Sequence, residues 1–166
     1  RDSVNKKEVA MLLDMLARFR GTVVVLPGNH DYYNQNQDAK VWKYFEDLIP
    51  KYDNILLLTS YHPYRLSING ESVVLYPALC TSRHSLSGEN NLGWIKEIEI
   101  QQDDSYHIGI AHGAVEGETI DNEGSYFIMK PSELEDIPVD AWWIGHTHVP
   151  FPRNLTDKFT KRLAKP

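Results

Sequence analysis

The sequence is poor in cysteine and has no long apolar run. Its single cysteine, Cys80, cannot form an internal disulfide, which favours a reducing, cytoplasmic setting. No apolar stretch approaches the roughly 18 residues of a membrane span, and the first residues lack the pattern of a signal peptide. We therefore expect no association with a membrane. Positive charge is also scarce, because 17 Lys and Arg face 23 Asp and Glu, and this balance argues against a surface that coats nucleic acid broadly.

The remaining composition is that of an ordinary globular domain, with 42% apolar residues in a chain of 166. Asn5 and Glu8 have the spacing of a capping box. Val9, Leu12, Leu13, Leu16 and Phe19 then predict the apolar stripe of a helix that reaches about Arg20. A buried strand over 22–26 follows Gly21. A helix followed by a buried strand is half of a βαβ unit, so the sequence predicts an α/β fold in one domain.

The rest of the chain alternates apolar runs with polar loops. We predict a helix over 39–48, a weak one over 91–98 and a single helical turn over 131–135. Buried strands are expected at 55–58, 107–111 and 141–144, and strands 64–68 and 72–76 flank the hairpin signal Asn69-Gly70. Residues 32–38, 80–93 and 114–130 are expected to be irregular.

Three polar turns come directly after buried strands. They are Asn29-His30-Asp31, His112-Gly113 and His146-Thr147-His148. Imidazole and oxygen donors suit manganese, iron and zinc, whereas the absence of clustered cysteines argues against a structural zinc site. Each turn alone has an ordinary explanation, since Gly, Asn and Asp favour turns and a lone histidine at a strand end is common. Three together favour a metal centre, and Gly145 is expected to make the turn that lets His146 and His148 reach adjacent positions.

The order of these motifs resembles the calcineurin-like metallophosphoesterase superfamily. Gly28-Asn29-His30-Asp31, the strand-end His112 and Gly145-His146-Thr147-His148 carry the resemblance, which covers residues 1–152. Within it, segments 107–118 and 138–150 resemble the DNA repair exonuclease branch, the SbcD type. Residues 153–166 are interpreted as a basic tail or the start of a further segment.

The resemblance implies a fold and a site. The family has a four-layer α/β/β/α architecture, a β-sandwich flanked by helices, and holds two divalent ions, for which we expect Mn²⁺ with Fe, Zn or Mg as alternatives. Asn29, His112 and His146 match ligands of one metal, and His148 matches a ligand of the other. His30 matches the histidine that touches the scissile phosphate. Asp31 would orient that imidazole and tune its charge.

The sequence departs from the family at its beginning. The family's first motif, Asp-x-His, and its second, Gly-Asp-x-x-Asp/His, do not occur. We therefore expect the chain to be the C-terminal portion of the domain, lacking the N-terminal strand or strands. Such a loss should leave unpaired backbone and an open apolar slot, so the chain alone is predicted to be unstable or homo-oligomeric.

The resemblance implies a metal-dependent phosphodiesterase of the DNA repair type, using a two-metal hydrolytic mechanism on DNA, with a possible ATPase partner subunit. One alternative is a phosphatase or a small-molecule or nucleotide phosphodiesterase of the same superfamily. A second is a non-catalytic scaffold whose metal site has decayed.

A few other residues have competing interpretations. Arg83 and His84 form a basic loop that could meet substrate phosphate. His107 begins a strand and is expected to face solvent. Trp142 and Trp143 alternate across a strand, and we expect them to pack in the core and between layers rather than stack on bases.

Overall fold

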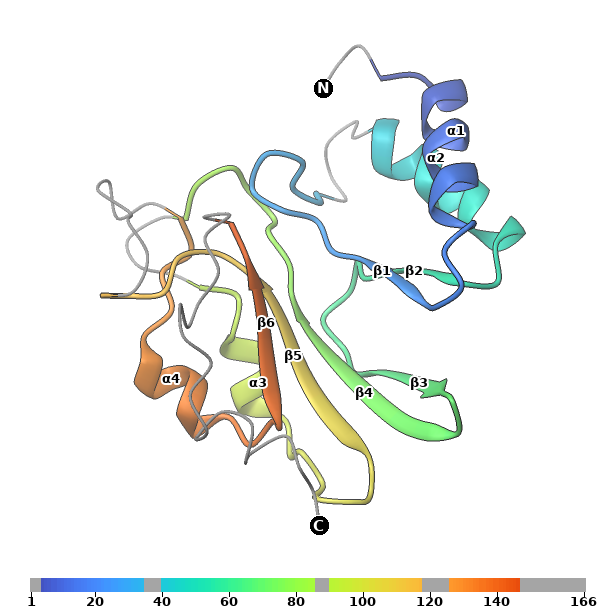
Figure 1. Ribbon diagram of the computed structural model, residues 1–166. Helices are drawn as coiled ribbons and strands as arrows, with labels where there is room; N and C mark the ends of the chain where they lie inside the picture. The colour runs from blue at the N-terminus through green and yellow to red at the C-terminus, as the bar shows by residue number, and fades with distance from the viewer. Residues whose placement is uncertain (1–3, 35–39, 86–89, 118–125, 147–166) are drawn as a thin grey trace.

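The computed structural model describes residues 4–34, 40–85, 90–117 and 126–146 (Figure 1). The helices are α1 (Lys6–Leu16), α2 (Lys40–Leu48), α3 (Gly93–Glu97) and α4 (Pro131–Asp136), and a short 3-10 helix, η1 (Ile49–Lys51), follows α2. The strands are β1 (Val23–Val25), β2 (Ile55–Leu57), β3 (Tyr64–Ile68), β4 (Glu71–Ala78), β5 (Tyr106–His112) and β6 (Ala141–Gly145). None of the described helices is long and apolar enough to cross a bilayer.

The strands form two sheets that pack face to face between helices. The small sheet pairs β1 with β2 in parallel, and the large sheet has the order β3-β4-β5-β6. Within the large sheet β3 and β4 are antiparallel, whereas β4, β5 and β6 run parallel. Helices α1 and α2 cover the small sheet, and α3 and α4 lie against the outer face of the large one (Figure 1). The predicted four-layer α/β/β/α architecture is confirmed.

The alternation of side chains along the short strands explains how two layers can pack on one small sheet. Successive residues of a strand point to opposite faces. Val23 and Val25 of β1 pack against the cluster under α1 and α2, while Val24 and Leu56 face the large sheet. Every residue of β1 is therefore apolar, as the sequence suggested.

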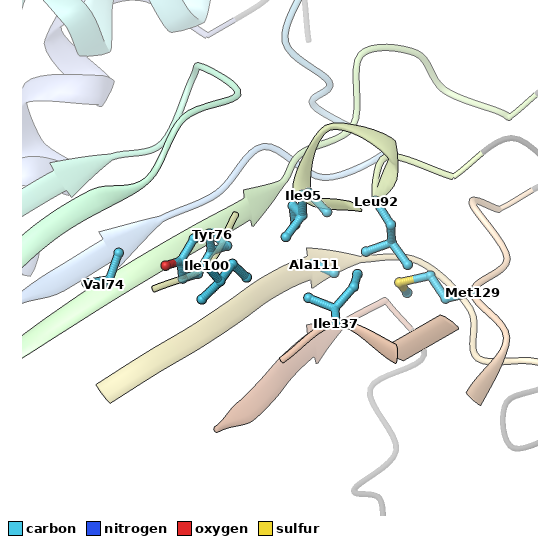
Figure 2. Packing of buried hydrophobic residues seen from close by; sticks show 9 residues of the cluster. Val74, Tyr76, Leu92, Ile95, Ile100, Ala111, Met129 and Ile137 are labelled. Carbon is cyan, nitrogen blue, oxygen red and sulfur yellow. The ribbon is translucent and has the colours of Figure 1, made fainter. Parts of the chain in front are cut away.

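Strand β4 is buried on both of its faces. Val73 and Leu75 belong to the core between the sheets. Val74, Tyr76 and Ala78 belong to the outer core. In Figure 2, Tyr76 lies beside Ile100, and Ala111 of β5 lies beside Ile137. Strands with both faces covered are continuous apolar runs rather than alternating ones, which is the pattern of residues 73–79.

The β3–β4 hairpin closes at Asn69 and Gly70, as predicted. Both residues have positive φ, 52° and 88°, which is the requirement of a type I′ turn. Ile68 and Glu71 pair across the loop, so the hairpin has only two residues in its turn.

Helix α1 begins as predicted and ends earlier than predicted. The Asn5 side chain accepts hydrogen bonds from the backbone of Lys7 and Glu8, and Glu8 bonds back to the Asn5 amide at 2.8 Å. The helix ends at Leu16 rather than near Arg20, because the Asn54 side-chain amide binds the carbonyls of the turn that follows. The shortest of these hydrogen bonds runs from Asn54 Nδ2 to the Phe19 oxygen, at 2.8 Å. The carbonyl groups after α1 thus accept hydrogen bonds from a side chain that is distant in sequence, rather than from a further helical turn.

One face of α1 and one tryptophan are exposed, contrary to prediction. Val9 and Leu13 are buried, but Leu12 and Phe19 are 45% and 63% exposed, so the predicted stripe was too wide. Trp143 was expected to pack and is 58% exposed. It pairs with Ile110 of the core between the sheets, but in the described part of the chain that core includes no residue of β6. Within the described residues β1 pairs with β2 alone, leaving its other edge unpaired. Self-association of the chain through the edge of β1 or through the exposed apolar side chains stays a prediction.

His107 is buried, so its predicted exposure was wrong. Its side of β5 faces the outer core, and only 2% of the residue is accessible. Burial is tolerated because both ring nitrogens have partners: Nδ1 lies 2.8 Å from the Tyr76 hydroxyl and Nε2 lies 3.1 Å from Asp103 Oδ1. Since a carboxylate only accepts, Nε2 donates to Asp103, and Nδ1 shares the second hydrogen bond with the Tyr76 hydroxyl.

Asp103 is held in its charged form by this network. The backbone and side chain of Ser105 donate to the carboxylate, and His107 adds a further hydrogen bond, which together lower the pKa of Asp103 to about 2. Arg65 lies 3.6 Å from its other oxygen. A carboxyl group whose pKa is lowered by folding stabilises the fold above its unfolded pKa and loses that contribution as the pH falls.

We therefore predict that Asp103→Asn lowers the free energy of unfolding at neutral pH. The difference from the parent should persist above the ordinary pKa of 3.8 and shrink as the pH falls toward 2. Urea unfolding at a series of pH values measures it. Asp104→Asn is the matched control, because its side chain is exposed and makes no hydrogen bond or ion pair within the described residues. A difference for Asp103→Asn that does not depend on pH would contradict the prediction.

Candidate metal centre

The predicted polar turns meet at one end of the sandwich. The loop after β1 and the C-terminal ends of β5 and β6 lie together there (Figure 1). Backbone hydrogen bonds hold the parts in place. Cys80 N donates to Pro27 O at 3.1 Å, and Gly113 N donates to Gly145 O at 3.0 Å. The first bond ties the loop to the chain after β4, and the second ties the ends of β5 and β6.

The loop over residues 28–31 is folded by its own aspartate. Asp31 Oδ1 accepts from Gly28 N at 2.9 Å, and the Trp42 indole on α2 donates to the Asp31 carbonyl. Short polar side chains that bond to nearby backbone favour such turns. Asp31 therefore shapes the loop that carries His30, and its predicted effect on the His30 ring stays a prediction.

Asn29 and His112 make the central contact of the site. Asn29 is 1% exposed, and its Oδ1 lies 3.0 Å from His112 Nε2. The His112 ring rests on the backbone of Gly28, where a Cβ would lie 2.8 Å from ring Cε1. Only glycine at position 28 allows this approach. Gly28 of the first motif thus makes room for the ring of His112, the last residue of β5.

His146 comes next to this pair, with its ring centroid 5.3 Å from that of His112. The backbone at this residue is unusual, because His146 has a positive φ of 142°. A non-glycine residue in this region carries strain of about 1–3 kcal/mol, and such strain concentrates at functional sites. His148 lies outside the described residues.

Cys80 supports the centre without being a ligand. Burial raises the pKa of its thiol to about 12, with a smaller contribution from Asp31, so the group is neutral. Its Sγ lies 3.4 Å from the backbone oxygen of His112. The thiol is a hydrogen-bond donor to the strand end that carries His112.

The predicted catalytic and substrate-binding residues are exposed. His30 is exposed at the tip of its loop. Arg83 and His84 are exposed in the chain after β4, and the Ser82 hydroxyl fixes the turn by donating to the His84 carbonyl at 2.7 Å. The His84 ring reaches the centre indirectly, through Tyr126.

Tyr126 was not predicted. Its ring centroid is 4.9 Å from that of His146 and 5.4 Å from that of His84. It lies in the irregular segment 114–130, where no periodicity or motif marks a single residue. Proximity to His146 arises only from the way this segment returns to the end of β5.

The donor set fits part of a metal site. Asn29 Oδ1 and His112 Nε2 lie 3.0 Å apart, and an amide oxygen and an imidazole nitrogen are donor types that could hold a divalent ion. No group of three His, Cys, Asp or Glu side chains suited to a metal ion occurs within residues 4–34, 40–85, 90–117 and 126–146. Asn29 is not one of these four residue types, and His148 lies outside the described residues.

Comparison with known proteins gives the family. No curated protein matches the chain. The family model described as calcineurin-like phosphoesterase matches residues 2–150. Since this match spans most of the chain, the protein belongs to the calcineurin-like phosphoesterase family and is a hydrolase of phosphate esters, in a family that binds divalent metal ions.

Proposed function

We propose that the protein is a phosphodiesterase of the DNA repair nuclease type, acting on DNA with two divalent ions, for which Mn²⁺ is our first choice. The observation that carries the proposal is the contact between Asn29 and His112, with His146 beside it, at the end of the sandwich. The branch assignment is supported by the sequence of segments 107–118 and 138–150. An ATPase partner subunit and a cytoplasmic location belong to the same proposal.

Each residue has a distinct part in the proposed reaction. Asn29, His112 and His146 would hold one ion and His148 the other, and the bound ions would supply electrostatic stabilisation of charge on the phosphoryl group. Asn29 contributes a neutral oxygen, so it adds no charge to the site. His30, exposed beside Asn29, would contact the scissile phosphate and give a proton to the leaving oxygen. Asp31 keeps its loop folded, and Arg83 and His84 would contact substrate phosphates.

The choice of substrate can be tested directly. In the natural protein with Mn²⁺, we expect linear DNA to be cleaved far faster than a small chromogenic diester such as bis(4-nitrophenyl) phosphate. Hydrolysis of small diesters or nucleotides alone would favour a small-molecule phosphodiesterase or phosphatase. Absence of both Mn²⁺ binding and hydrolysis of any phosphoester would favour the scaffold with a decayed metal site and overturn the proposal.

The role of Gly28 gives a prediction for metal binding. Gly28→Ala would place a methyl group 2.8 Å from the His112 ring, so His112 must move away from Asn29. We expect Mn²⁺ affinity to fall by about 10–100-fold, the usual effect of disturbing the support of a ligand. Isothermal titration calorimetry measures the affinity, and circular dichroism checks the fold.

Gly93→Ala is the matched control for this substitution, because a Cβ there meets nothing within 4 Å. It should leave Mn²⁺ affinity unchanged. A folded Gly28→Ala protein that binds Mn²⁺ as tightly as the parent would remove His112 from the proposed site.

The role of His30 predicts a different pattern. His30→Asn removes the proton donor and leaves the ligands in place, so turnover should fall by about 10²–10⁴-fold while Mn²⁺ affinity is retained. Steady-state kinetics and calorimetry on the same sample measure the two quantities. Unchanged turnover with metal bound would show that the catalytic assignment of His30 is wrong.

A further inference from the structure

Tyr126 joins the metal centre to the exposed loop after β4. Its ring is 4.9 Å from His146 at 39° and 5.4 Å from His84 at 42°. With His112 beyond His146, four aromatic rings form a row from the buried strand end to the surface. Tyr126 is half-buried and His84 is exposed, so the outer part of this row is open to solvent.

The backbone that carries Tyr126 is fixed on several sides. Ala114 N donates to the Tyr126 carbonyl at 2.9 Å, and the buried Ser85 hydroxyl accepts from Phe127 N at 2.9 Å. The Asn90 side chain donates to the Ile128 carbonyl at 3.0 Å. These bonds come from three different segments of the chain. The position of Tyr126 therefore does not depend on local structure alone.

Two further features show how tightly this segment is pressed against β5. Phe127 has a φ of 50° although it is bulky and buried. Any larger residue at position 113, directly after His112, would collide with the backbone of Phe127. A Cβ on Gly113 would lie 2.5 Å from the Phe127 oxygen. Bulky residues rarely adopt positive φ, and strain of this kind persists only where the surroundings enforce it. The fold thus holds Tyr126 next to His146.

Packing alone does not explain this placement. Tyr126 belongs to none of the three apolar clusters that build the described core. Its neighbours are rings at the surface of the proposed site, and a half-buried tyrosine ring there offers a flat, rigid surface to a bound molecule. Flat aromatic surfaces bind planar groups, nucleobases above all, by stacking.

We propose that Tyr126, backed by His146 and flanked by His84, is a substrate-binding residue that stacks on a nucleobase attached to the phosphoester. The inference rests on the proposed phosphodiesterase function and names a residue that would bind the nucleoside part of its substrate. Ring stacking tolerates any base, so this residue favours nucleotides over alkyl esters without selecting a sequence.

The test compares two substrates with the same leaving group. Thymidine 5′-(4-nitrophenyl phosphate) carries a base, and methyl 4-nitrophenyl phosphate carries none. With Mn²⁺ the parent should prefer the thymidine ester in kcat/KM. Tyr126→Leu should lower that preference by roughly ten-fold, within the range of one stacked base, and Tyr126→Phe should restore it. The preference is the ratio of the two kcat/KM values within each protein, so a change in rate that both esters share does not alter it.

Binding measurements separate a substrate contact from structural support. Calorimetry with Mn²⁺ present should show thymidine 5′-monophosphate losing affinity for Tyr126→Leu, while methyl phosphate and Mn²⁺ itself bind as in the parent. If Mn²⁺ affinity falls with the affinity for both phosphates, Tyr126 only supports His146 and the inference is overturned. An unchanged ratio of the two affinities also overturns it.

Failure of this inference is distinguishable from failure of the proposed function. A parent that hydrolyses the methyl ester, with a preference for thymidine unaffected by Tyr126→Leu, keeps the phosphodiesterase and removes Tyr126 from substrate binding. A parent that binds Mn²⁺ but cleaves no DNA and neither hydrolyses nor binds any of these esters overturns both. Thermal unfolding of each variant identifies loss of fold.

Discussion

The site depends on one contact across the two sheets, between Asn29 after β1 and His112 at the end of β5. These strands belong to different sheets, so the 3.0 Å separation exists only if the sheets pack in one register. The absence of a side chain at Gly28 then lets the His112 ring lie on the backbone. The inter-sheet core around Leu58 and Leu75 sets that packing. The stability of the sandwich and the geometry of the centre therefore both depend on the packing between the two sheets.

The two ends of β5 have different chemistry although the strand is continuous. At its start His107 is buried and fully used by Tyr76 and Asp103, which makes it a structural residue. At its end His112 meets Asn29 and lies near His146, where partners come from loops. Two histidines of one strand thus differ in role because parallel strands present their carboxyl ends, and the loops that follow, at a common edge.

The strained backbone of the protein concentrates at that same edge. His146 and Phe127 have positive φ without being glycine, whereas Asn69 has it in an ordinary hairpin. The edge loops are anchored by side chains from elsewhere, including Ser85 for Phe127 and Trp42 for Asp31. Rigid support from distant segments is what a site needs if its donors are to keep their positions without regular secondary structure.

The sequence by itself determined the α/β class, the order of the elements, the capping box, the two-residue hairpin and the motifs that identify the family. These features depend on residues close together in the chain. Only the tertiary structure decided that Asn54 ends α1 early, that His107 is buried, that Leu12 and Trp143 are exposed, and that Tyr126 adjoins His146. Each of these features depends on a contact partner that is distant in sequence, or on how far a neighbouring layer extends over the residue. Local propensity and periodicity carry no information about such contacts.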